Sequence, residues 1–114
     1  MGKLVLLNAL PINAFPDRWQ DFAIQVRRAI VEDLKLAITE NTKVECYIRH
    51  TGTVQLLQQI LNIKLEPSAQ LYRYNEGDDV YVITLKNPVR GADVQPSAEE
   101  IEIYKIVAAK GILL

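Results

Sequence analysis

Residues 48–61 have the sequence IRHTGTVQLLQQIL, in which a short apolar run ends at the chain's only histidine and a helix is predicted to begin. Apolar side chains recur at Val54, Leu57 and Leu61, which is the spacing of one face of an α-helix. The two threonines that precede this face can cap the first turn. His50 is therefore expected just before a helix N-terminus.

The position of His50 suggests a site for an anion. Unpaired backbone N–H groups and the positive end of the helix dipole point to this place, so a phosphate would be attracted there. An imidazole held beside a phosphate can transfer a proton. Alternatively, His50 is a partly buried side chain bonded to the backbone, which is the more common state of a lone histidine. Its position in the sequence leaves both interpretations open.

The composition is that of one globular domain spanning residues 1–114. Hydrophobic residues make up 49% of the chain and charged residues 24%, enough for a single core with a solvated surface. The formal net charge is −1, which argues against a protein that coats duplex nucleic acid, because such binding needs a clustered excess of Lys and Arg. A small anion pocket is still compatible with this charge.

Cys46 is the single cysteine, so a disulfide within the chain is impossible. One Cys and one His do not make a four-ligand zinc site, and we expect no metal. This cysteine usage favours a reducing compartment, and we expect the protein in the cytoplasm. No charged-then-apolar leader is present and the apolar runs are short, so neither secretion nor a membrane partner is expected.

The first predicted element is a buried central strand over residues 3–7, an unbroken apolar run that ends in a turn. Asn8 and Asn13 follow its C-terminal end. Ligands of open α/β sheets gather beyond the carboxyl ends of strands, so both side chains are candidate ligand contacts. The alternative is that asparagine is simply favoured in turns.

The remaining pattern predicts alternating strands and helices. Period-two alternation and β-rich composition indicate strands, and apolar side chains three and four apart indicate helices. The expected elements are strands over 22–28 and 44–48, a helix over 30–38 that stops at Asn41, a hairpin of 70–74 with 80–85 around the loop 75–79, a helix from the capping box Ser97–Glu100 to residue 108, and a short strand over 112–114. Lys86 and Arg90 lie in a polar loop between the hairpin and the helix predicted from Ser97, where cations are usually just solvated.

Three groups of residues, taken in order and spacing, resemble the small viral and bacterial ring nuclease family first met as an archaeal-virus anti-CRISPR. They are Leu7-Asn8-Ala9-Leu10 with Ile12-Asn13, His50-x-x-Thr53 at the mouth of a helix, and Gly91 followed by Ser97-x-x-Glu100. The resemblance covers nearly the whole chain. With the predicted elements, the resemblance implies a single α/β domain that forms a homodimer. Its mixed sheet is expected to have about five to six strands, flanked by about three helices.

The resemblance also implies a function. Members bind cyclic tetra-adenylate, a second messenger of type III CRISPR defence, across the dimer two-fold and cut it without a metal or cofactor, in the host cytoplasm if the protein is viral. The ribose 2′-hydroxyl attacks the phosphorus and leaves a 2′,3′-cyclic phosphate. His50 matches the family's general acid, Thr53 the threonine of that motif, and Asn8 and Asn13 the asparagines that line the pocket. Thr51 is counted among the expected ligand contacts as well.

The chain departs from the family pattern at several positions. Arg49 stands where a glycine usually precedes the histidine, and Pro11 stands where a serine is usual. The arginine expected ahead of the glycine loop is replaced by Asn87 and Pro88. A phosphate-stabilising cation is then expected from a nearby residue, the candidates being Arg49, Lys86 and Arg90. Arg90 is preferred, because neighbouring strand residues alternate sides and Arg49 can point away from His50.

Two functions from different classes follow from this sequence. The first is a metal-independent ring nuclease with His50 as general acid. The second is a non-catalytic module that sequesters a cyclic oligonucleotide or regulates a partner protein. A structural dimer without a ligand is the weakest interpretation.

Overall fold

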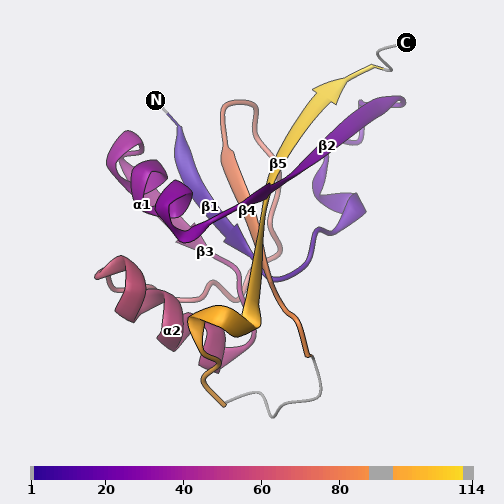
Figure 1. The fold of residues 1–114 in the computed structure, drawn as a ribbon. Helices are drawn as coiled ribbons and strands as arrows, with labels where there is room; N and C mark the ends of the chain where they lie inside the picture. Colours follow the sequence, from indigo (N-terminus) through magenta and orange to yellow (C-terminus); the bar gives the residue numbers. More distant parts are fainter. Residues whose placement is uncertain (1, 88–93, 112–114) are drawn as a thin grey trace.

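The computed structural model describes residues 2–87 and 94–111. The chain contains five strands, two α-helices and two short 3₁₀ turns within these ranges (Figure 1). In chain order they are β1 (Lys3–Leu7), η1 (Ile12–Ala14), β2 (Phe22–Ala29), α1 (Val31–Glu40), β3 (Lys43–Cys46), α2 (Thr51–Leu61), β4 (Asp79–Leu85), η2 (Ala98–Glu100) and β5 (Ile101–Lys110).

The five strands form one mixed sheet in the order β2-β5-β4-β1-β3. β1 pairs in parallel with both β3 and β4, whereas β5 is antiparallel to β4 and β2. Leu4, Val5, Leu6 and Leu7 of β1 are all buried, as the unbroken apolar run predicts for a strand covered on both faces. The parallel strands end at the same edge of the sheet, and α2 begins beyond that edge (Figure 1).

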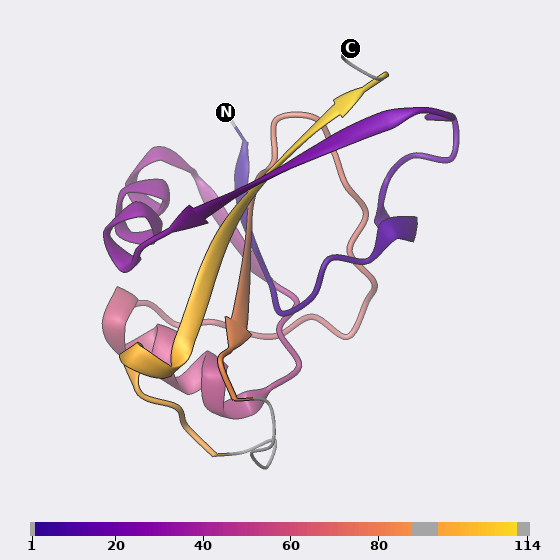
Figure 2. The same ribbon diagram turned by 45° about the vertical axis from the view of Figure 1, so that its right-hand side comes forward.

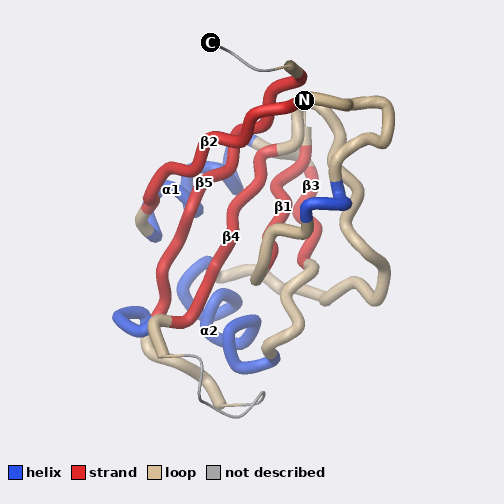
Figure 3. The backbone as a smooth tube through the Cα atoms, turned by 90° about the vertical axis from the view of Figure 1, so that its right-hand side faces the viewer, coloured by secondary structure: helices blue, strands red, loops and turns tan. Residues whose placement is uncertain are grey.

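Both α-helices cover the same face of the sheet, as Figures 2 and 3 show from two directions. Leu34 of α1 and Leu57 of α2 are fully buried there against alternate residues of the strands, such as Leu4 and Leu6. Loops cover part of the opposite face, where Val5 and Val80 pack against Tyr72. The α/β class, the single domain and the mixed sheet are therefore as predicted, with two α-helices in the described residues instead of three.

The elements before His50 follow the prediction closely. The strand expected over 22–28 is β2, and the helix expected over 30–38 is α1. Asp33 accepts the backbone N–H of Ile30 at 2.8 Å, which satisfies one of the free donors at the start of α1. Asn41 is the C-terminal cap, and its side chain donates to the carbonyl of Ala37 at 2.8 Å. β3 is shorter than predicted and ends at Cys46, a buried thiol whose pKa is raised by burial.

The helix predicted from Ser97 to residue 108 is wrong. The capping box does form, since the backbone N–H of Ser97 donates to Glu100 at 2.9 Å, but it closes only the single turn η2. The chain then continues as β5, which is hydrogen-bonded to β4 on one side and β2 on the other. Ile101 and Ile103 are both buried on the helix-covered face, so period-two burial in the sheet prevails over the helical spacing. Residues 112–114, predicted as a final strand, lie outside the described residues.

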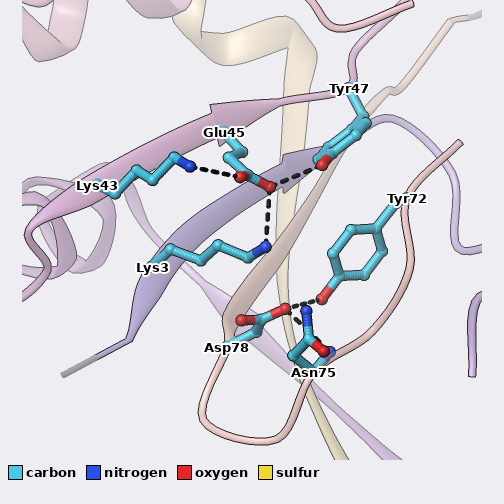
Figure 4. Close-up of polar contacts among 7 residues, drawn as sticks. All are labelled: Lys3, Lys43, Glu45, Tyr47, Tyr72, Asn75 and Asp78. Carbon is cyan, nitrogen blue, oxygen red and sulfur yellow. Dashed lines mark hydrogen bonds and ion pairs between the residues drawn. The ribbon is translucent and has the colours of Figure 1, made fainter. Parts of the chain in front are cut away.

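The predicted hairpin of 70–74 with 80–85 is also wrong. β4 already pairs with β1 on one side and β5 on the other, so it has no open edge with which residues 70–74 could pair. This segment lies on the loop-covered face instead, and the backbone N–H of Tyr74 donates to the carbonyl of Ala14 at 2.8 Å. The buried Tyr72 donates its hydroxyl to Asp78 at 2.5 Å (Figure 4). Burial and this hydrogen bond raise the pKa of the Tyr72 phenol, which keeps it a donor.

A polar network joins β1 to β3 on the loop-covered face of the sheet (Figure 4). The carboxylate of Glu45 accepts the hydroxyl of Tyr47 at 2.7 Å and forms ion pairs with Lys3 at 3.0 Å and Lys43 at 3.2 Å. The pKa of Glu45 is lowered to about 2, mainly by the hydrogen bond from Tyr47 and then by the two ammonium groups. Burial and the bond to Glu45 raise the pKa of Tyr47 to about 12. Glu45 is therefore charged and fully engaged at neutral pH.

Candidate functional site

His50 is the N-cap of α2 and lies at the junction between β3 and that helix. Its backbone is extended, and its Nδ1 accepts the backbone N–H of Thr53 at 3.0 Å. The same nitrogen lies 2.8 Å from the hydroxyl oxygen of Thr53. The prediction that the threonines cap the helix is therefore wrong: His50 is the cap, and Thr51 and Thr53 are in the first turn. An imidazole can replace the usual hydroxyl or carboxylate cap because its neutral ring carries one acceptor nitrogen.

The contact with Thr53 determines which ring nitrogen of His50 carries the proton. Because Nδ1 accepts an N–H, the neutral imidazole carries its hydrogen on Nε2. In the imidazolium, Nδ1–H can instead donate to the hydroxyl oxygen of Thr53, which is already 2.8 Å away. Thr53 is buried to 1% exposure and so cannot turn away readily. Thr53 therefore presents to Nδ1 both a donor, its backbone N–H, and a hydroxyl oxygen that can accept.

The first turn of α2 is suited to an anion on the side of Thr51. The N–H groups of a first turn have no partner within the helix, and the dipole adds partial positive charge. Thr51 is exposed at this end, whereas Gly52 is buried. A Cβ at Gly52 would collide with the carbonyl of Val94, which passes directly over the helix. No role was predicted for Gly52 from the sequence, although a glycine in the first turn of a predicted helix often marks such a close approach.

Asn8 reaches the same junction from the end of β1. Its side-chain oxygen accepts the backbone N–H of Arg49 at 3.3 Å, one residue before His50. β1 and β3 are parallel neighbours, so their carboxyl ends bring this asparagine and the histidine together. The structure therefore brings Asn8, Arg49, His50, Thr51 and Thr53 to the same junction. Their roles toward a ligand stay predictions.

The side chain of Arg49 is directed at the backbone of residues 68–70. Nη1 donates to the carbonyl of Ser68 at 2.6 Å, and Nη2 lies 3.4 Å from the carbonyl of Ala69 and 3.2 Å from that of Gln70. The arginine is exposed, and its guanidinium serves as a clamp on an adjacent loop.

The other predicted ligand residues lie elsewhere or outside the described part of the chain. Asn13 is exposed in η1, and its carbonyl accepts a hydrogen bond from Arg73 at 3.2 Å. Lys86 is exposed after β4 and lines a cavity of about 510 Å³ with the N-terminal end of α1; His50 does not line this cavity. Arg90 and Gly91 lie outside the described residues. Within residues 2–87 and 94–111, no three His, Cys, Asp or Glu side chains are grouped to hold a metal ion.

The fold described above, a mixed five-stranded sheet with both helices on one face, is shared with known proteins. A family model described as STIV B116-like matches residues 4–108, and the chain belongs to this family. A solved structure with the same fold is B116 of Sulfolobus turreted icosahedral virus, with a TM-score of 0.71 and 22% sequence identity over 92% of this chain and 98% of that chain. No curated protein matches the sequence. Among the described residues, no helix is long and apolar enough to cross a membrane.

Proposed function

We propose that the protein is a metal-independent ring nuclease that binds and cleaves cyclic oligoadenylate, in particular cyclic tetra-adenylate, and so switches off type III CRISPR signalling. The observation that carries the proposal is the contact between His50 Nδ1 and both the N–H and the hydroxyl of Thr53. It explains why a His-x-x-Thr spacing would suit a general acid at a helix N-terminus. The resemblance found in the sequence supplies the substrate class.

The chemistry needs little from the protein because the substrate supplies the nucleophile. The ribose 2′-oxygen bonds to phosphorus, the bond from phosphorus to the 5′-oxygen breaks, and the product is a 2′,3′-cyclic phosphate. The 2′-hydroxyl proton is released to solvent. The imidazolium of His50 gives its Nε2 proton to the departing 5′-oxygen and becomes the neutral ring, while Nδ1–H donates to the hydroxyl oxygen of Thr53. The N–H groups of the first turn of α2, with Thr51 and Asn8 beside them, hold the phosphate in line for the attack.

The ring is proposed to lie across the two-fold of a homodimer. Cyclic tetra-adenylate contains two-fold symmetry, so two identical half-sites can each hold one scissile phosphate with the same contacts. Its four phosphates must be attracted by a chain of net charge −1, which requires a few cations gathered near the site. Arg90 and Lys86 are the proposed sources of this positive charge. Asn13 is proposed as a further, uncharged ligand contact.

One experiment separates the enzyme from the alternatives. Purified protein is incubated with labelled cyclic oligoadenylates of several ring sizes in excess chelator, and the products are separated. Linear fragments with 2′,3′-cyclic phosphate ends support the enzyme, and a ring of the same size in which the attacking 2′-hydroxyls are replaced by hydrogen should stay intact. Cleavage of the deoxy ring would show that water is the nucleophile and would refute this mechanism.

A non-catalytic binding module is the second candidate, and two observations favour it. Asn87 and Pro88 stand where the family pattern has an arginine, and the guanidinium of Arg49 is occupied by loop carbonyls. Loss of a charge that stabilises the transition state costs on the order of 10²–10³ in rate, which could leave binding without useful turnover. In the same experiment this module would retain the labelled ring uncut.

A further inference from the structure

The contacts of Arg49 do not match those of a phosphate ligand. Its two terminal nitrogens are directed at three consecutive carbonyl oxygens, those of Ser68, Ala69 and Gln70, the shortest at 2.6 Å. Carbonyl oxygens carry partial negative charge, so they compete with a phosphate for the same N–H groups. A planar guanidinium reaches these carbonyls with two nitrogens held in a rigid fork, whereas a lysine has a single nitrogen and no such fork.

The loop that Arg49 holds is itself fastened to the elements that carry His50. This loop follows α2 and runs back beside β3. The backbone N–H of Leu65 donates to the side chain of Gln58 in α2 at 2.8 Å, and the N–H of Ser68 donates to the carbonyl of Cys46 in β3 at 2.8 Å. Arg49 adds the third attachment, from the residue just before the helix to the loop just after it.

The backbone of Arg49 is restrained from the other side as well. Its N–H donates to the side-chain oxygen of Asn8 at the end of β1. The residue before His50 is thus fixed between β1 on one side and the loop 68–70 on the other. The angle at which the chain enters α2, and therefore the direction of the imidazole, depends on these contacts.

We propose that Arg49 is a positioning residue: it holds the junction between β3 and α2 so that His50 Nε2 points at the scissile phosphate, and it does not bind the phosphate. This inference rests on the proposed ring nuclease function and replaces the sequence-based expectation that Arg49 supplies a ligand cation. It also explains how an arginine can stand where the family pattern has a glycine. The larger side chain is accommodated because its guanidinium is directed at the carbonyl oxygens of residues 68–70.

The test compares Arg49→Lys, which keeps the charge, with Arg49→Ala, which removes it, and uses Arg18→Ala in an exposed loop as the matched control. We expect both Arg49 variants to lower the single-turnover cleavage rate at least about tenfold, because a small misplacement of a catalytic group can cost that much or more. Ring affinity should stay within about threefold of wild type, and the slope of affinity against salt should not change, since no phosphate contact is lost. Arg18→Ala should leave all three quantities unchanged.

A second measurement does not depend on the substrate. Hydrogen exchange of the Thr53 amide reports whether His50 still caps α2, and it should become faster in both Arg49 variants but not in Arg18→Ala. If Arg49→Lys cleaves like wild type while Arg49→Ala binds the ring weakly with a flatter salt dependence, Arg49 is a phosphate ligand and the proposal is overturned. If the wild type cleaves no ring, the proposed function fails, and the amide exchange alone decides whether Arg49 positions the junction; unchanged exchange in both variants overturns that role too.

Discussion

Replacing His50 with asparagine or alanine separates its structural role from its chemical one. His50 caps α2 through Nδ1, and loss of a good N-cap costs about 1 kcal/mol of stability. For a domain of this size that is a drop of about 4 °C in the unfolding temperature. Asparagine is among the best N-cap residues but has no group that can donate a proton at neutral pH. His50→Asn should therefore melt within about 1 °C of wild type, and His50→Ala about 4 °C below it.

Cleavage, in contrast to stability, should fall equally in the two variants. Both variants lack the general acid, so single-turnover cleavage of cyclic tetra-adenylate should fall by roughly 10²–10⁴ in each, with much smaller changes in ring affinity. Calorimetry and rapid-quench kinetics on the same three proteins provide the comparison. Cleavage by His50→Asn at the wild-type rate would remove His50 from the mechanism. Equal melting temperatures for wild type and His50→Ala would show that the histidine does not cap the helix.

Four further predictions follow from other parts of the chain. Gly52→Ala should destabilise the protein by about 1–3 kcal/mol in chemical denaturation, because the added methyl group meets the carbonyl of Val94; an increase in stability, as helix propensity alone would give, would contradict this close approach. The lowered pKa of Glu45 stabilises the folded protein at pH values above 4.5, the usual pKa of this carboxyl group. This contribution is lost as the pH falls toward about 2. The difference in unfolding free energy between wild type and Glu45→Gln should therefore shrink over this range, and a difference that does not depend on pH would show that the Glu45 contacts do not favour its charged form. Arg90→Ala should weaken ring binding or cleavage at least about tenfold and reduce the sensitivity to salt. If neither Arg90→Ala nor Lys86→Ala has an effect, the pocket lies elsewhere. Light scattering and titration should give a dimer that binds one ring, whereas an active monomer would rule out the shared site.

The parts of the fold that could be predicted are those where local pattern and tertiary environment agree. The run at residues 3–7 is apolar throughout because β1 is covered on both faces, and α1 has an acidic first turn and an asparagine cap. The segment after Ser97 satisfies both a helical and a strand pattern, since Ile101, Tyr104 and Ala108 fit one and Ile101 and Ile103 the other. Only the presence of β2 and β4 on either side decides between them, and this pairing is not visible in a local window.

The candidate site shows the same limit. Asn8 and His50 could be placed together because parallel strands end at one edge of a sheet. The direction of Arg49 depends on a loop about twenty residues farther along, whose path is set by its contacts with Gln58 and Cys46. The role of Gly52 depends on the backbone of Val94, which is distant from it in the sequence. Neither contact leaves a periodic signal in the chain.

The pairing of β2 with β5 has a consequence for how the chain folds. β2 is made early, yet its ladder partner within the described residues is the last strand to leave the ribosome. Until β5 arrives, the eight residues of β2 present two open edges, and β4 lacks one neighbour. Contacts so distant in sequence slow folding, and an unpaired strand invites association with other chains. A chain truncated before Ile101 should therefore aggregate instead of folding to a smaller sheet, and nascent protein should acquire protease resistance only once β5 has left the ribosome.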